Sequence, residues 1–539
     1  MKKLELLALM ALLVCVMAGV VYAASPYAPV VGAVRDIEEL WAIEDARQES
    51  EAPLVTALQN HGAPLAYDKN ENTFYCPIGL NHGENWPELY LTAPDASGIT
   101  LCFSDDYAYD SCAEAVAEGY SYELMAYSDT QYSYFSIVFT GLPIISIDVQ
   151  QEIGTQDVPA AFAMSTPGSG ALSGPSRVHL RGDSGLVWTD KPGYRVEFTR
   201  EADGTKKVSR SVPGFIETDA ILLLPMALDD TLMRDRLSWD MYALLSPHTQ
   251  SFGARRSRYV ELFVSGEYAG VYLMLEPMDV ADELAKAGPR AAMTDSVYRS
   301  AVLKMEKDRP IMEDAKCNGW GYELFHAPDM NDGFRALAGF FGVLTQEDDA
   351  AFKKAALESI DVDSFVRYVI FSEAAGLADN SGNNVFLWAH EADGRLVYRY
   401  KPWDMDRSWG IDAGYEFDYW FLLSVADRIL ALDVGGARTL ALEVWNEMKN
   451  KGFTLETVEA LVAQYTHELN DSGAALRNAL RWDSEHAIAD GYGILSYCQV
   501  RFPMFDRLFD ALAGSDETFD FLCGDLSVDD LVVRPIRLN

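Results

Sequence analysis

The chain is poor in cysteine, histidine and basic residues, and each shortage argues against a class of function. It has 7 cysteines in 539 residues, none in the Cys-x-x-Cys spacing of zinc or dithiol redox sites. None of its 8 histidines falls in a metal-ligand pattern. Lysine and arginine total 43 against 82 acidic residues, and this net charge of −39 repels phosphate backbones and anionic lipid. The composition therefore argues against zinc chemistry, nucleic-acid binding and attachment to an acidic membrane surface.

Long apolar runs are also missing, except at the N-terminus. Two lysines precede an almost unbroken apolar stretch over residues 6–21, and the small-residue motif Val21-Tyr22-Ala23 is typical of a cleavage site. This pattern predicts a signal peptide over residues 1–23 and an exported protein, extracellular or at the cell surface. A retained membrane anchor is the alternative interpretation. No later stretch is long and apolar enough to span a bilayer, so no membrane span is expected after cleavage.

The sequence after this N-terminal stretch predicts a folded chain of several domains. Its 49% hydrophobic and 12% aromatic residues favour folding over disorder, and its length exceeds the size of one core. A helical segment or linker is expected over 24–65. Short runs rich in Tyr, Phe, Ile and Thr predict a small all-β, sandwich-like domain over 66–149. Strands followed by helices predict a two-lobed α+β unit over 150–512, before a C-terminal extension over 513–539.

Three cysteines, Cys76, Cys102 and Cys112, fall in the predicted β domain. Export would permit one disulfide bridge among them. Isolated buried thiols explain them equally well, and spacing alone does not choose between the two.

Residues 383–410, NNVFLWAHEADGRLVYRYKPWDMDRSWG, predict a β-hairpin. Two strand-like runs flank Asp393-Gly394, one of the strongest two-residue turn signals. A turn that pairs Ala392 with Arg395 fixes the register of the whole ladder, because every other pair follows from it.

This register brings oxygen-bearing side chains together at the open end of the hairpin. Asn383 then faces Asp404 and Asn384 faces Trp403, with opposed Cα atoms about 4.5–5.5 Å apart. Asp406 follows two residues after Asp404. Because magnesium prefers a few oxygen ligands and keeps room for water and phosphate, we expect a metal site here.

Asp379 precedes the hairpin at the end of a predicted helix and stands five residues before Asn384. This is the spacing of the protein-kinase catalytic loop, in which the Asp accepts the proton of the substrate hydroxyl and the Asn holds magnesium. In kinases a further Asp binds the metal that bridges the ATP phosphates, and Asp404 fits that place. The alternative is that Asp379 and Asn384 only cap and turn the chain between a helix and a strand.

Six blocks of sequence occur in a fixed order along the chain. They are LPIISIDV, RVHLRGDSG…KPGYRVEF, DDTLMRDRLSWDM, VELFVSGEYAGVYLMLEP, DNSGNNVFLW and YKPWDMDRSWG. Together they resemble the CotH family of secreted and spore-coat bacterial protein kinases, over about residues 142–501. The resemblance implies an atypical kinase-like fold with ATP and Mg²⁺, or Mn²⁺, in a cleft between two lobes.

The same resemblance implies roles for the residues at the hairpin. Asp379 would be the catalytic base, and Asn384 and Asp404 would bind the metal. Asp406 would be a second acidic metal ligand or a structural support for the first.

It also implies an ATP-binding set made of Lys191, Arg181 and Arg234. Such cations would neutralise phosphate charge, which this acidic chain especially needs. The sequence departs from the family pattern at Asp183, where asparagine is usual, and at Gly185, where a small polar residue is usual.

These observations predict an exported kinase that transfers the γ-phosphoryl group of ATP to Ser or Thr of a protein, such as a coat or cell-surface protein. One alternative is a non-catalytic surface or adhesion module with the same fold, because ATP is scarce outside cells. The other is a metal-dependent glycosyltransferase, because Asp404-Met405-Asp406 is also the D-x-D form that holds manganese and a sugar nucleotide. The glycosyltransferase would require a parallel α/β sheet before Asp404.

Overall fold

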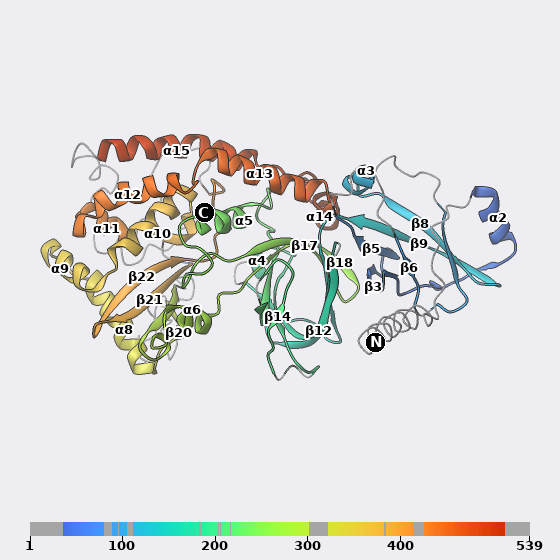
Figure 1. Ribbon diagram of the computed structural model, residues 1–539, viewed down its shortest axis with the longest axis horizontal. Coiled ribbons are helices and arrows are strands. Elements are labelled where there is room, and N and C mark those ends of the chain that lie inside the picture. The colour runs from blue at the N-terminus through green and yellow to red at the C-terminus, as the bar shows by residue number, and fades with distance from the viewer. Residues whose placement is uncertain are drawn as a thin grey trace, which may run out of the picture.

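The computed structural model describes residues 36–79, 89–94, 96–104, 112–167, 169–182, 185–202, 204, 206–215, 217–300, 322–381, 384–412 and 425–512. The predicted signal peptide and C-terminal extension lie outside these residues. Within them, no helix is both long and apolar enough to cross a membrane. The architecture is α+β, with an N-terminal sheet, a barrel and a helical region arranged in a row (Figure 1).

The N-terminal part is a small, mostly β unit around one mixed sheet of order β4-β5-β9-β8-β7, with β1 on β9. Its strands begin before residue 66, because β2 pairs with β3 and with β6 in a second sheet. Cys76 and Cys102 are buried here as free thiols. The elements are α2 (Ile37–Asp45), β1 (Gln48–Glu49), β2 (Gln59–Asn60), β3 (Ala63–Pro64), β4 (Ala66–Asp68), β5 (Thr73–Pro77), β6 (Leu91–Thr92), β7 (Thr100–Phe103), α3 (Cys112–Ala117), β8 (Ser121–Tyr127) and β9 (Gln131–Thr140).

A closed barrel of order β10-β11-β12-β13-β16-β18-β17 follows. β10 pairs with β11 and, in parallel, with β17, so this strand belongs to the barrel and not to the small β unit in which the sequence analysis placed it. A turn at Ser265-Gly266 joins β17 to β18, with Val264 opposite Glu267. The elements are β10 (Ile144–Val149), β11 (Val158–Thr166), β12 (Ser169–Arg181), α4 (Gly185–Trp188), β13 (Gly193–Phe198), β14 (Arg210–Ser211), β15 (Glu217–Thr218), β16 (Ala220–Leu224), β17 (Ser257–Val264) and β18 (Glu267–Leu275).

Alternation along the barrel strands divides their side chains between two cores. On β18, Tyr272 and Met274 point into the barrel, whereas Val271 and Leu273 point outward into the larger core of the helical region. Successive residues of a strand face opposite sides, and here both faces are apolar because both are covered. The barrel is thereby fixed against the helices by its outer face.

The helical region surrounds an antiparallel sheet of order β20-β19-β21-β22, formed by β19 (Ser296–Ser300), β20 (Tyr322–His326), β21 (Val385–Ala392) and β22 (Arg395–Pro402). β21 and β22 form the predicted hairpin in the predicted register, from Ala392 opposite Arg395 to Val385 opposite Pro402. Because all described pairs of this sheet are antiparallel, the sheet that leads to Asp404 lacks the parallel order that the glycosyltransferase alternative requires.

Helices cover this sheet and extend along one side of the molecule (Figure 1). They are α5 (Arg234–Ala243), α6 (Val280–Ala287), α7 (Ala291–Thr294), α8 (Met330–Leu344), α9 (Asp349–Ser359), α10 (Val362–Ala375), η4 (Ala378–Ser381), α11 (Val425–Ala431), η5 (Val434–Gly436), α12 (Ala437–Asn450), α13 (Leu455–Asn470), α14 (Ala474–Trp482) and α15 (Tyr492–Leu512). α14 joins all three parts, since its Arg477 donates to Glu261 of the barrel and Thr140 of the N-terminal sheet. The division into two kinase-like lobes stays a prediction.

Candidate active site

The open end of the β21–β22 hairpin meets the end of helix α10. This helix stops at Gly376, whose φ of 67° is left-handed, and the short turn η4 then carries Asp379. Asn384 Nδ2 donates a hydrogen bond to Asp379 Oδ2 over 2.7 Å. The Trp403 amide donates to the Asn384 carbonyl over 2.9 Å, which confirms that these two residues face each other. Asn383 lies outside the described residues.

Asn380, which the sequence analysis missed, locks this junction. Its side chain is 1% exposed, and its Nδ2 donates to the carbonyls of both Asn384 (2.9 Å) and Trp403 (3.0 Å). The Tyr368 hydroxyl donates in turn to the Asn380 carbonyl. Nothing in the polar loop DNSGNN distinguishes this asparagine from its neighbours, so only the folded arrangement identifies it.

Two site residues adopt left-handed backbone conformations, Asn384 and Asp404, each with φ 54°. This region costs most L-residues about 1–2 kcal/mol, and Asn and Asp adopt it more readily than other non-glycine residues. The identity of both residues is therefore favoured by the turn that each must make where the hairpin ladder ends.

Asp404 and Asp406 line a cavity of about 110 Å³ together with Arg181, Asp229 and Asp235, and we call it the carboxylate cavity. Arg181 ends strand β12 of the barrel, and Asp235 comes from helix α5. The side chains of Asp404, Asp406 and Arg181 make no hydrogen bond or ion pair with any described residue. Three charged groups of the cavity therefore have no partner among the described residues, whereas Asp229 and Arg407, which also line it, are paired.

The acidic residues of this cavity lie close enough to raise one another's pKa. Burial raises the pKa of Asp235 to about 7, and the charge of Asp404 adds to it, whereas Arg181 lowers it. Burial also raises the pKa of Asp406, and Asp404 is the next cause. The charge of Asp379 acts on Asp406 as well, which places the predicted base in the same electrostatic cluster. Burial lowers the pKa of Arg181, and Asp404 opposes this.

These groups fit a hard divalent cation. No three His, Cys, Asp or Glu side chains of the described residues form a ready-made cage. Magnesium does not require one, because it binds through one or two carboxylates and completes its shell with water and phosphate oxygens. Asp235 Oδ1 is buried without a hydrogen-bond partner in the described structure, and a cation would offset the charge that raises the pKa of Asp406. Asp404 and Asp406 line the cavity and would hold the ion, whereas Asn384, the third predicted ligand, is not among the lining residues.

Arg234, predicted to bind ATP, lies beside this cavity rather than in its lining. Its guanidinium donates to Asp229 and to Asp230, the latter over 2.5 Å. It therefore braces Asp229, which does line the cavity.

Lys191, the other predicted ATP ligand, is not among the lining residues either. Its ammonium donates to the Val271 carbonyl (2.5 Å) and to Asn478 Oδ1 (2.8 Å), and it sits 4.7 Å from the centre of the Tyr272 ring. Burial lowers its pKa to about 7. In this arrangement Lys191 joins the barrel to helix α14, and Arg181 is the predicted cation that faces the cavity.

Asp235 is the main residue that the sequence analysis overlooked. A usable signal existed, because the block DDTLMRDRLSWDM places charged residues on every face of a helix. Helix α5 indeed buries Arg234, Asp235 and Arg236 together with its apolar residues. Asp183, at which the sequence departs from the family pattern, lies outside the described residues.

A comparison with protein families found a match to the part of the chain that contains this cavity. A family model described as CotH kinase protein matches residues 178–495, which is more than half of the chain. The match includes Arg181, Asp235, Asp379, Asn384 and both acids that follow the hairpin. A comparison with curated proteins found no match.

Proposed function

The chain belongs to the CotH kinase protein family, and from this premise we propose that it is an exported protein kinase of two lobes. It transfers the γ-phosphoryl group of ATP to a Ser or Thr hydroxyl of a protein acceptor, such as a coat or cell-surface protein. It uses Mg²⁺, for which Mn²⁺ can substitute. Export rests on the N-terminal sequence pattern.

One observation carries this proposal. Asp379 and Asn384, at kinase-loop spacing, are hydrogen-bonded beside Asp404 and Asp406, whose carboxylates have no partners among the described residues. Phosphoryl transfer requires a base, metal ligands and charge neutralisation at one place, and little covalent chemistry from the protein.

Each residue has a distinct task in this scheme. Asp379 accepts the proton of the attacking hydroxyl, and the hydrogen bond from Asn384 keeps its carboxylate oriented. Arg181 donates to phosphate oxygens, since its guanidinium has no other described partner. A magnesium ion held by Asp404, Asp406 and Asn384 would neutralise charge on the β- and γ-phosphates.

A non-catalytic surface module is the second candidate, and the size of the carboxylate cavity favours it. Its volume of about 110 Å³ is smaller than the ~300–1,000 Å³ of typical ligand pockets. A cation and a phosphate group fit such a space, whereas a whole nucleotide requires more. A magnesium-dependent thermal shift with ATP is expected of the kinase, and its absence with every nucleotide would favour the module.

The decisive experiment is transfer of label from ATP to a generic acceptor by the purified mature protein with magnesium. We expect Asp404→Ala to reduce the rate at least about a hundredfold, because it removes a charge that acts in the transition state. Asp393→Asn is the matched control, since Asp393 occupies the far turn of the same hairpin with a φ of 50° that asparagine tolerates. Equal transfer by the wild type and Asp404→Ala would refute the assignment of the site.

A further inference from the structure

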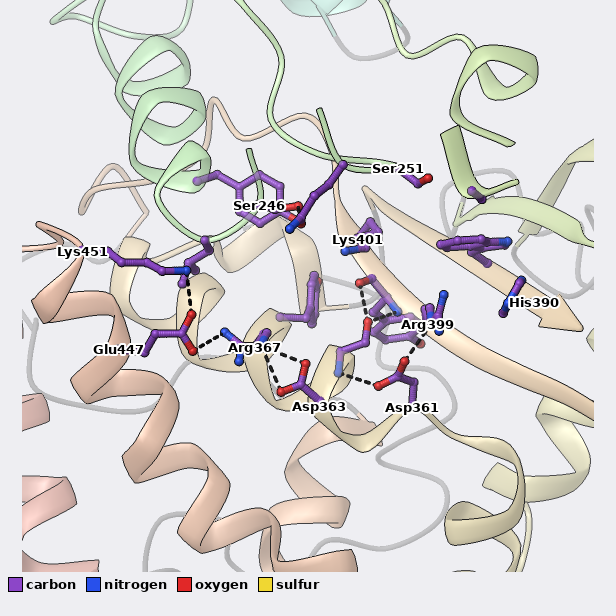
Figure 2. A pocket seen from close by; sticks show the side chains of 18 residues that line it. Ser246, Ser251, Asp361, Asp363, Arg367, His390, Arg399, Lys401, Glu447 and Lys451 are labelled. Carbon is purple, nitrogen blue, oxygen red and sulfur yellow. Dashed lines mark hydrogen bonds and ion pairs between the residues drawn. The ribbon is translucent and has the colours of Figure 1, made fainter. Parts of the chain in front are cut away.

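A second, larger cavity of about 520 Å³ shares no lining residue with the carboxylate cavity. It lies between one face of the β21–β22 hairpin, the start of α10, the segment after α5 and the end of α12 (Figure 2). We call it the basic pocket after its cationic side chains, Arg367, Arg399, Lys401 and Lys451. Its volume falls within the ~300–1,000 Å³ range of small-molecule sites.

The hairpin forms an elongated floor for this pocket. Trp388, His390, Arg399 and Lys401 project from the same face, because Trp388 pairs with Arg399 and the others stand two residues away along their strands. The rows that hold Lys401 and His390 are four residues apart, or about 13 Å at ~3.3 Å per residue. Between them, the Arg399 guanidinium lies 4.8 Å from the centre of the Trp388 ring, which makes a flat middle section.

All three carboxylates in the pocket are already paired, as the dashed lines of Figure 2 show. The ion pairs are Arg399–Asp361 (2.8 Å), Arg367–Asp363 (2.8 Å), Arg367–Glu447 (2.8 Å) and Lys451–Glu447 (2.7 Å). Four permanent cations therefore face three anions, in a protein whose net charge is −39. The local excess of positive charge is the opposite of the overall composition.

Two polar groups at the ends of the floor, one donor and one acceptor, have no partner among the described residues. Lys401 is half-buried, and its ammonium makes no hydrogen bond or ion pair with the described part of the chain. His390 Nδ1 is held by Asp295 Oδ2 over 2.8 Å, and the fully buried Asp295 also accepts from the Trp388 indole over 2.8 Å. This fixes the imidazole ring, while its Nε2 has no partner among the described residues. Because Nδ1 donates its proton to the Asp295 carboxylate, Nε2 of the neutral ring is a hydrogen-bond acceptor.

We propose that the basic pocket binds a small, elongated organic anion. A phosphate or carboxylate group of this ligand contacts Lys401, and its body lies against the Arg399 guanidinium that covers Trp388. A hydrogen-bond donor at its other end contacts His390 Nε2. A small ligand is favoured over an acidic protein, because the large net negative charge repels an acidic surface over its whole area. The excess positive charge of the pocket acts only within about one Debye length, ~8 Å at physiological salt.

Calorimetric titration of the full mature chain, without ATP or metal, tests this proposal. The probes are glucose 6-phosphate, 4-hydroxybenzoate, inorganic phosphate and a hexaglutamate peptide. We expect one of the two organic anions to bind more tightly than inorganic phosphate and the peptide. Lys401→Met is expected to weaken that binding about tenfold or more, because it removes a charge-assisted hydrogen bond. Lys353→Met, at an exposed lysine of α9, is the control and should bind like the wild type.

Several outcomes would overturn the proposal. They are no binding of either organic anion by the wild type, binding of hexaglutamate alone, and equal affinities of the wild type and Lys401→Met. A thermal melt establishes that each variant is folded, and Lys401→Arg, which keeps the charge, should retain most of the affinity. His390→Gln should weaken binding of the organic anion but not of inorganic phosphate, since phosphate alone cannot span both ends of the floor. Equal effects on both ligands would remove His390 from the site.

Discussion

The carboxylate cavity and the basic pocket stand beside the same hairpin strand, with Lys401 only three residues before Asp404, yet they treat acidic groups in opposite ways. In the cavity, burial and neighbouring acids raise the pKa of Asp235 and Asp406. In the pocket, hydrogen bonds from Lys451 and then Arg367 lower the pKa of Glu447. An ionised carboxylate thus destabilises the fold in the carboxylate cavity and stabilises it in the basic pocket, where cations are bonded to it.

This difference indicates what each site lacks. The cavity has more negative charge than Arg181 and Arg407 can neutralise, so a cation completes it. The pocket has paired all its acids and keeps an extra cation at Lys401, so an anion completes it. Charges held without partners cost stability, and proteins retain them where function requires them.

The largest expected difference between the two sites is the pH dependence that Asp235 gives to the free energy of unfolding. Its pKa is raised from ~3.9 to about 7, so the folded state holds a proton that the unfolded state releases between about pH 4 and pH 7. The free energy of unfolding therefore falls as pH rises through this window, by up to about 1.4 kcal/mol per pH unit. Asp235→Asn should remove this loss and be more stable than the wild type by about 3 kcal/mol at pH 8.

Urea unfolding of both proteins at pH 5 and pH 8 measures this effect, and the exposed Asp490→Asn is the control. The gain of Asp235→Asn should shrink toward pH 5, where the wild-type carboxyl is already protonated. Millimolar magnesium should reduce the gain at pH 8, because a bound cation offsets the same negative charge. A gain that is equal at both pH values would mean that Asp235 titrates normally.

A smaller effect is expected from the residue that holds the cavity in shape. Asn380→Ala removes both hydrogen bonds that join η4 to the carbonyls of Asn384 and Trp403, and leaves these buried carbonyls short of a donor. The Asn384 carbonyl keeps the Trp403 amide as a donor, so the Trp403 carbonyl carries most of the cost, and we expect a loss of about 2 kcal/mol in the free energy of unfolding. Phosphotransfer should fall further than this loss explains, because Asp379 is no longer positioned relative to Asp404.

Chemical denaturation together with initial rates of label transfer measures this prediction. Asn331→Ala, at an exposed position in the first turn of α8, is the matched control. If Asn380→Ala lost stability but kept full activity at a temperature where it is folded, Asn380 would be structural only.

The predictable parts of this structure are those set by local pattern. The Asp393-Gly394 turn determines the hairpin register, so the meeting of Asn384 with Trp403 followed from sequence. A hydrogen bond joins Asp379 and Asn384, the two residues at kinase-loop spacing, and their roles stay predictions.

The parts that could not be predicted depend on contacts between distant segments. β10 has the alternating pattern of any strand, and only its pairing with β17, more than a hundred residues later, places it in the barrel. Lys191 has the positive charge of a phosphate ligand, but its ammonium donates a hydrogen bond to Asn478 of α14. The basic pocket draws on α5, α10, α12 and both hairpin strands, and no single stretch of sequence contains that combination.

The smallest effect is expected in the basic pocket, and it has the opposite sign to that of Asp235. Hydrogen bonds from Lys451 and Arg367 lower the pKa of Glu447, so its contribution to stability is present above the unfolded pKa of ~4.3 and is lost as pH falls. Because its side chain is 33% exposed, Glu447→Gln should cost less than about 1 kcal/mol at pH 7, and still less at pH 4. Glu443→Gln, at an exposed position one turn earlier in α12, is the control for urea unfolding. If Glu447→Gln were more stable than the wild type at pH 7, the ion pairs of Glu447 would not offset the cost of its negative charge. Acidic residues would then destabilise both sites.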